Sequence, residues 1–309
     1  MDNTRINRQS DLQFTGETSL SEKLGPGFWL AAGWILIITG AALCAGIFPL
    51  PPPDHMNWMN PAALPGTPCA VPVLQASGEY VEAPFVHIFG TDQLGRDILT
   101  RMIFGARVSL AVGLVTPLLG LLGGGVLGML AGFYRGRVEA VTMALMDAIL
   151  AFPGLVLLLM AVFYFGASLS SLILVLGFLT VPAFTRVARA NTLTFAKKEF
   201  VVAARAMGQS DAQILILEIL PNILIPLLVY ALLVVSYMIV AEGALSFLGL
   251  GVPPPAPSWG EMISQGKEVL EESAHISLVP ACVMFLTVLS FNVVGDAVRT
   301  LIDKRESCL

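Results

Sequence analysis

The sequence predicts an all-α integral membrane protein with six transmembrane helices. Hydrophobic residues make up 56% of the 309 residues, charged residues only 13%, and the mean hydropathy is +0.79. A water-soluble chain carries roughly a quarter of charged residues. Long stretches without Asp, Glu, Lys or Arg recur along the chain, and the basic residues gather in alternate connecting segments. These three observations favour a multi-pass membrane protein.

Five uncharged stretches are long enough to cross a hydrocarbon core about 30 Å thick, which takes about 20 helical residues. The stretch between Asp147 and Arg186 would form a helix of about 57 Å, too long for one crossing. Residues 166–171 in its middle, GASLSS, are typical of a turn, so it splits in two. The predicted spans are 28–50, 109–133, 140–165, 170–189, 221–244 and 276–298.

The basic residues predict the orientation, because cytoplasmic segments of membrane proteins are enriched in Lys and Arg. Six spans place both termini on one side. That side would hold Arg5, Arg8, Lys23, Arg135, Arg137, Arg186, Arg189, Lys197, Lys198, Arg205, Arg299, Lys304 and Arg305, whereas the other side would hold Arg96, Arg101, Arg107 and Lys267. We therefore expect cytoplasmic tails at 1–27 and 301–309, an external loop at 51–104, and a five-helix core at 105–300. The first span is too long for a signal peptide and is expected to be retained.

The external loop is rich in proline and shows little periodicity before residue 85. Residues 90–110 then suggest a helix along the outer surface, with Asp97 and Arg101 forming an i,i+4 pair. A solvated amphipathic helix without a ligand is the alternative interpretation.

Two features of the spans bear on helix packing. Gly120, Gly124, Gly128 and Gly132 recur every four residues and predict one bare helix face for close packing against another span. The Pro153–Gly154 pair predicts a kink in the third span.

The segment 197–222 is cationic and rich in alanine, between very apolar spans. It predicts two short helices separated at Gly208, a residue suited to a left-handed stop. Ser210 and Gln213 have the spacing of a capping box, and Pro221 is expected to end or kink the second helix. Such a helix–turn–helix at a membrane surface favours a docking element for another protein, and an ordinary cytoplasmic loop is the alternative.

Glu242 lies near the outer end of the fifth span, and Asn292 lies in the sixth. An ionisable group there should face the bundle interior, a cavity or the headgroups. Both residues are candidates for the pathway or its gate. Trp259, in the second external segment, suits the membrane interface.

Several classes of function find no support in the residues. The chain has no GxxxxGK[ST] phosphate loop, no HExxH and no GxSxG motif. Cys44, Cys69, Cys282 and Cys308 have no metal-ligand spacing, and the three histidines are scattered, so we assign no metal site. We expect neither a catalytic site, a cofactor bound by this chain, nor a nucleic-acid partner.

Four segments resemble the permease subunits of bacterial ABC importers of the dipeptide/oligopeptide/nickel class, specifically the C-type subunit. They are GTDQLGRD with GARVSL (90–97 and 105–110), AARAMG followed by ILPN (203–208 and 219–222), LSFLGLGV with PSWG (245–252 and 257–260), and FNVVGDAVR (291–299). As a set they are highly specific and cover most of residues 85–305, whereas the first 85 residues match only in layout.

The resemblance implies a type I ABC importer permease fold with a cytoplasmic coupling helix, in the bacterial inner membrane. It implies a second homologous permease subunit, two ATP-binding subunits that use ATP and Mg, and an external solute-binding protein. The segment 197–222 would dock on one ATPase. Its implied coupling residues are Glu199, Ala203, Ala204, Arg205, Gly208, Asp211 and Pro221. Val202 stands where the family usually has an acidic residue.

Two rival hypotheses remain: a self-sufficient secondary transporter or channel, and a membrane scaffold without transport. The expected signature of the first, interrupted helices in two matched halves, is not evident. Dipeptides or oligopeptides are the default solutes, with nickel chelates and glutathione-like molecules still open.

Overall fold

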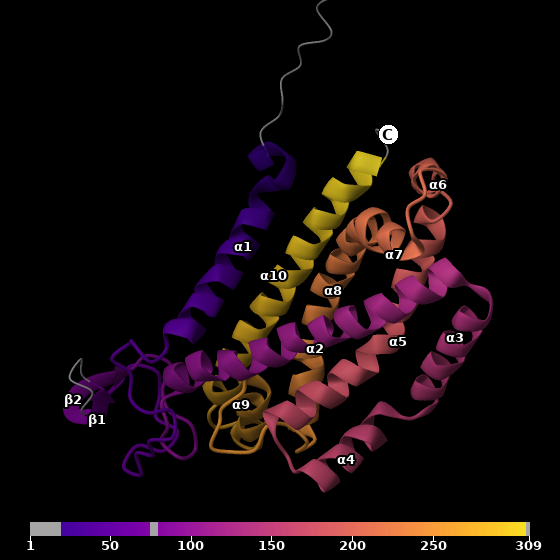
Figure 1. Ribbon diagram of the computed structural model, residues 1–309. Coiled ribbons are helices and arrows are strands. Elements are labelled where there is room, and N and C mark those ends of the chain that lie inside the picture. Colours follow the sequence, from indigo (N-terminus) through magenta and orange to yellow (C-terminus); the bar gives the residue numbers. More distant parts are fainter. Residues whose placement is uncertain (1–19, 75–79, 307–309) are drawn as a thin grey trace, which may run out of the picture.

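A computed structural model describes residues 20–74 and 80–306, and it is a tilted helical bundle with a small β-hairpin at one end (Figure 1). The long helices are α1 (Leu20–Cys44), α2 (Ile98–Tyr134), α5 (Leu169–Phe195), α8 (Leu220–Phe247) and α10 (His275–Glu306). Five helices in the described part are long and apolar enough to cross a membrane, or six if the bent pair α3 (Gly136–Ala151) and α4 (Gly154–Phe165) counts as one span. The six predicted spans all correspond to helices.

The ends of several spans were predicted wrongly. The helix α1 stops at Cys44, before the predicted end at Leu50, and the boundaries drawn at 104/105 and 300/301 fall inside α2 and α10. Most of the predicted tail at 1–27 lies outside the described residues. The start of α2 was placed too late in the chain because Arg101 was expected to lie on an outer surface helix. Its side chain is instead 1% exposed.

The third predicted span is a sharp corner rather than a kinked rod. At Pro153 the chain turns by 78° between α3 and α4. Proline lacks the N–H that would continue the helix, and Phe152 before it is extended.

The loop between α1 and α2, which was predicted to be external, contains an antiparallel hairpin that was not predicted. Strands β1 (Thr67–Leu74) and β2 (Tyr80–His87) pair from Thr67 opposite His87 to Leu74 opposite Tyr80. Prolines in both strands hid the pattern, and they are tolerated because each strand of a two-stranded sheet has an unpaired edge. Figure 1 places the hairpin beyond the lower end of α1.

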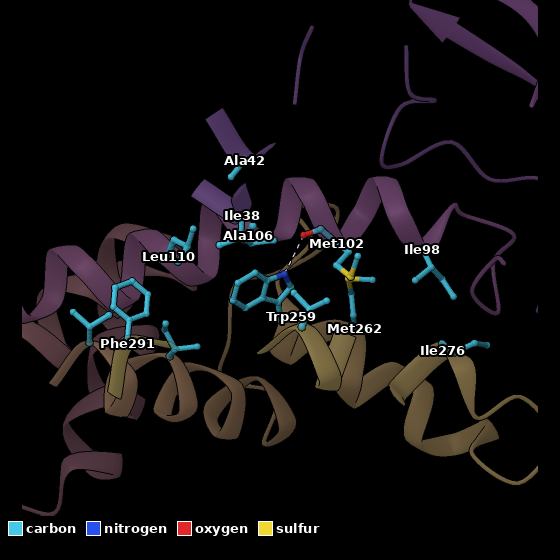
Figure 2. Close-up of a cluster of buried hydrophobic side chains, with 13 residues drawn as sticks. Ile38, Ala42, Ile98, Met102, Ala106, Leu110, Trp259, Met262, Ile276 and Phe291 are labelled. Carbon is cyan, nitrogen blue, oxygen red and sulfur yellow. Dashed lines mark hydrogen bonds between the residues drawn. The ribbon is translucent and has the colours of Figure 1, made fainter. Parts of the chain in front are cut away.

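The core at the hairpin end gathers side chains from five helices (Figure 2). Trp259 of α9 (Trp259–Gly266) is fully buried there, and its Nε1–H donates to the Met102 carbonyl oxygen at 3.0 Å. The Trp259 side chain therefore faces the bundle interior and does not face the headgroups, as a residue of an aromatic belt would. The helices α1, α2, α8, α9 and α10 meet around this side chain, and Ile38, Ala106, Met262 and Phe291 belong to the same cluster.

A second cluster lies at the opposite end, where α6 (Glu199–Ala206), α7 (Asp211–Gln213) and the π-helix Ile214–Ile219 (η1) join the bundle. Its members come from α2, α5, α6, η1 and α8. The connection between α5 and α8 is therefore packed on the bundle.

Candidate functional site

The segment between α5 and α8 folds as two short helices around a turn. Gly208 has a φ of +83°, the left-handed conformation that favours glycine, and no atom lies within 4 Å of the place a Cβ would take. Ser210 Oγ accepts from the Gln213 N–H at 3.4 Å, and Gln213 Oε1 accepts from the Ser210 N–H at 2.9 Å. The stop at Gly208 and the capping box are as predicted.

Pro221 does not end the second helix. The run from Asp211 to Phe247 is continuous, and Pro221 occupies the first turn of α8. In η1 the hydrogen bonds shift to i→i−5, so that the Leu220 N–H donates to the Leu215 carbonyl oxygen. This shift comes directly before the residue that has no N–H to donate, and the helix continues through it.

One face of α6 is buried. Val201 is 3% exposed and Ala204 1%, and both pack in the cluster that contains Ile214 of η1 and Phe184 of α5. The prediction that Ala204 belongs to the exposed docking surface is wrong, because its methyl group faces the bundle. Its small size instead lets α6 lie close to η1 and α5.

The other face of α6 is open. Val202 is 63% exposed and Ala203 is also exposed, and Met207, which follows the last residue of α6, is 75% exposed. Lys197, Lys198 and Glu199 are exposed at the start of the helix. The surface therefore combines apolar side chains with a basic edge.

Arg205 and Asp211 flank the turn at Gly208. Their closest atoms are 3.7 Å apart, and both side chains are more than half exposed. Arg205 also lies over the Phe133 ring, 5.8 Å from its centroid. An exposed pair of this kind contributes about 0–1 kcal/mol, so it leaves both charges available to a partner.

The four glycines of α2 face α5, whose C-terminal end leads to α6. A methyl group added at Gly128 would lie 2.7 Å from the Ala188 Cβ, and one added at Gly124 would lie 2.7 Å from the Phe184 Cβ. Gly120 and Gly132 are equally close to α5 side chains. The two backbones approach closely because these side chains are missing.

Glu242 and Asn292 do not share a site. Glu242 is fully buried, and its carboxylate accepts from the hydroxyls of Ser109 at 3.0 Å and Ser246 at 2.8 Å. Ser109 Oγ also accepts from the Trp259 N–H at 3.2 Å. Glu242 thus links α2, α8 and α9, whereas Asn292 is half-buried on α10 outside this group.

A buried charge network at the hairpin end was missed from the sequence. We call Asp92, Arg96, Arg101, Glu261 and Gln265 the hairpin-end charge network. Arg101 pairs with Glu261 at 2.8 Å and Arg96 with Asp92 at 2.7 Å. Arg96 also donates to Gln265 Oε1 at 2.8 Å, and Gln265 donates to Glu261. The expected pair of Asp97 with Arg101 is wrong, because the Asp97 carboxylate caps α2 and contacts His87.

The hairpin-end charge network joins segments about 160 residues apart in the chain. Burial raises the pKa of Glu261 above its ordinary value, although Arg101 and Arg96 attract its charged form. The one signal in the sequence was the presence of charges in otherwise apolar surroundings, at Arg101 and Glu261.

The site offers a binding surface rather than reactive groups. Within the described ranges, no three His, Cys, Asp or Glu side chains lie close enough to hold a metal ion. The distinctive features are the open face of α6 and its anchored inner face.

Comparisons with known proteins agree with this architecture. Residues 124–307 match the family described as "Binding-protein-dependent transport system inner membrane component". A glutathione transport system permease protein GsiD of Pectobacterium atrosepticum is 36% identical over 219 residues, which is 71% of this chain and 73% of that protein. A putative peptide transport system permease protein of Brucella suis is 41% identical over the same length, covering 71% and 74%.

Among solved structures, the chain resembles a subunit of the MetNI methionine ABC transporter in an inward-facing conformation. The TM-score is 0.56 at 19% identity, over 66% of this chain and 97% of the other. This likeness shows the fold. The chain therefore belongs to the family of binding-protein-dependent transport system inner membrane components, and it is a multi-pass permease subunit of an ABC importer rather than an enzyme.

Proposed function

We propose that this chain forms the translocation pathway of a peptide importer together with a second homologous permease subunit. Dipeptides and oligopeptides, with glutathione-like molecules among them, are the proposed solutes, because relatives at 36% and 41% identity carry the names of glutathione and peptide permeases. An external solute-binding protein delivers the solute, and two ATPase subunits hold the ATP and Mg.

The open face of α6 is the proposed docking surface for one ATPase subunit. The observation that carries this proposal is the division of α6 into an anchored face and an open one. Val201 and Ala204 are buried, whereas Val202 and Met207 are more than 60% exposed. The exposed apolar face would bind the ATPase subunit, and the anchored face would transmit a displacement of α6 to the bundle.

The two helices beside the segment would carry the motion. The helix α5 precedes the coupling segment in the chain. The helix α8 follows it, and the helical run from α7 through η1 into α8 has no break. Closure of the ATPases on ATP would shift α6 and hence both spans, switching the pathway between outward and inward access. This scheme requires the segment and both termini to be cytoplasmic, as the distribution of Lys and Arg favours.

The variant Gly208→Asp tests the docking surface in the assembled importer. The position has open space around it, and Asp tolerates the left-handed conformation better than most residues. We expect the protein to insert while ATP-driven peptide uptake falls at least tenfold, because a carboxylate now stands at the docking face. Gly249→Asp is the matched control, since Gly249 also has a positive φ of +77° and open space, at the other end of α8.

Equal uptake in the two variants would contradict the docking role.

Transport assays in proteoliposomes distinguish an importer subunit from the rival hypothesis of a self-sufficient secondary transporter or channel. We expect no peptide uptake from this chain alone, and uptake when the second permease, the ATPases, ATP and the binding protein are added. Uptake by this chain alone would instead identify a secondary transporter or channel.

A further inference from the structure

An apolar groove of about 450 Å³ opens on the surface between α8, α9 and α10. Apart from glycines, its lining consists of Val240, Ala244, Phe247, Leu248, Ile263 and Met284. It lies away from the coupling segment, at the end of α8 that is followed by α9 (Figure 1).

Two glycines form the floor of the groove, where α8 and α9 touch. Gly243 of α8 and Gly260 of α9 both line it, and they face one another so closely that a methyl group on Gly260 would lie 2.5 Å from the Gly243 Cα. A side chain at Gly260 would push the two helices apart. From Leu248 back to Val240 the groove follows about two helical turns, or about 12 Å.

A cation, Lys267, lies beside the groove. The Lys267 ammonium lies 4.1 Å from the centroid of the Phe247 ring, a cation–π contact. Within the described ranges Lys267 forms no ion pair, and the residue is exposed. Its three N–H donors are therefore free for an anion.

We propose that the groove binds one acyl chain of a phospholipid whose phosphate pairs with Lys267. The apolar walls suit a hydrocarbon chain and offer no hydrogen-bonding side chain for the backbone of a peptide solute, whose polar groups would lose their water without compensation. The flanking faces are apolar and exposed, at Tyr237 of α8 and Phe285 of α10, as on a surface in contact with lipid. Lys267 lies beyond the end of α8 and outside the candidate spans, and a basic residue that flanks a span suits the phosphate of a headgroup.

A second groove provides a comparison. It lies between α4 and α5, measures about 380 Å³, and its lining includes Leu157, Ala161, Leu174 and Phe178. No basic residue lines it. Lipid in this groove would have no phosphate contact of the kind that Lys267 provides. The second groove therefore serves as an internal control.

Native mass spectrometry of the whole importer tests the proposal, after delipidation and addition of phosphatidylethanolamine, phosphatidylglycerol or diacylglycerol. We expect the wild type to retain one more phospholipid than Ala244→Phe, which fills the groove. Leu174→Phe, in the second groove, should retain the wild-type number. Diacylglycerol should not be retained, because it lacks the phosphate.

Lys267 is tested separately, at an exposed position where substitution leaves the fold unchanged. We expect Lys267→Gln to weaken retention five- to tenfold and Lys267→Arg to preserve it. Equal retention in the wild type, Ala244→Phe and Lys267→Gln would overturn the proposal. So would retention of diacylglycerol equal to that of both phospholipids, or a photo-cross-linker at Ala244 that captures the second permease subunit instead of lipid. None of these outcomes bears on the docking of α6.

Discussion

The two ends of the bundle differ in the burial of their charged side chains. At the hairpin end, Arg101 and Glu261 pair at 2.8 Å with side chains 1% and 11% exposed. At the coupling end, Arg205 and Asp211 are 3.7 Å apart with side chains 64% and 51% exposed. The first end satisfies its charges within the chain, whereas the second leaves them open to a partner.

The apolar residues follow the same division. Trp259 is fully buried at the hairpin end, where it joins five helices. Val202 and Met207 at the coupling end are largely exposed. One end therefore buries its large apolar side chains, whereas the other leaves apolar side chains exposed, as the proposed docking surface requires.

The largest expected effect is at Arg101. Replacing it by Met leaves Glu261 buried without its closest cation, which costs about 3–5 kcal/mol. Thermal unfolding of the purified chain in detergent measures the loss. In Arg101→Met/Glu261→Met both charges are gone, and we expect stability close to that of the wild type. A double variant as unstable as the single one would show that the charges are not the cause.

The same variant should respond to pH. Burial already raises the pKa of Glu261, and loss of Arg101 removes the strongest opposing attraction. A carboxyl whose pKa is higher in the folded state contributes stability at low pH and loses it as the pH rises through that pKa. The deficit of Arg101→Met relative to the wild type should therefore shrink as the pH is lowered from about 7 towards about 4.5. A deficit independent of pH would exclude Glu261 as its source.

An intermediate effect is expected where α2 meets α5. Gly128→Ala brings a methyl group to 2.7 Å from the Ala188 Cβ, and overpacking of this kind costs about 1–3 kcal/mol. Gly125→Ala is the control, because its nearest neighbour would be the Leu227 Cδ1 at 3.8 Å. Equal melting temperatures of the two variants would contradict tight packing of these helices.

The smallest effect is expected at Asp211. Asp211→Asn removes the exposed partner of Arg205 and should change the free energy of unfolding by no more than about 0.5–1 kcal/mol. A loss as large as that in Arg101→Met would mean that the coupling end is no less self-contained than the hairpin end.

The positions of the membrane helices could be predicted from the sequence, because uncharged stretches of span length are a local signal. The start of α2 could not. The buried Arg101 pairs with Glu261, 160 residues later, as well as with Asp92, and no local pattern contains the pairing with Glu261. The hairpin was missed for a different reason, since Pro68, Pro72 and Pro84 lie within its strands.

The coupling segment shows the same limit. Gly208 and the Ser210–Gln213 box could be read directly, because turns and caps depend on neighbouring residues. Which face of α6 is buried depends on η1 and α5, so Ala204 was assigned to the wrong side. Pro221 was expected to interrupt the helix because the π-helical shift before it has no simple sequence signature.

The uninterrupted run from Asp211 to Phe247 has a mechanical consequence. At 1.5 Å per residue its 37 residues follow a helical path of about 55 Å. No loop interrupts this path, so a displacement of α7 would not be absorbed by a flexible connection before it reaches α8. The π-helix keeps the helix unbroken across Pro221.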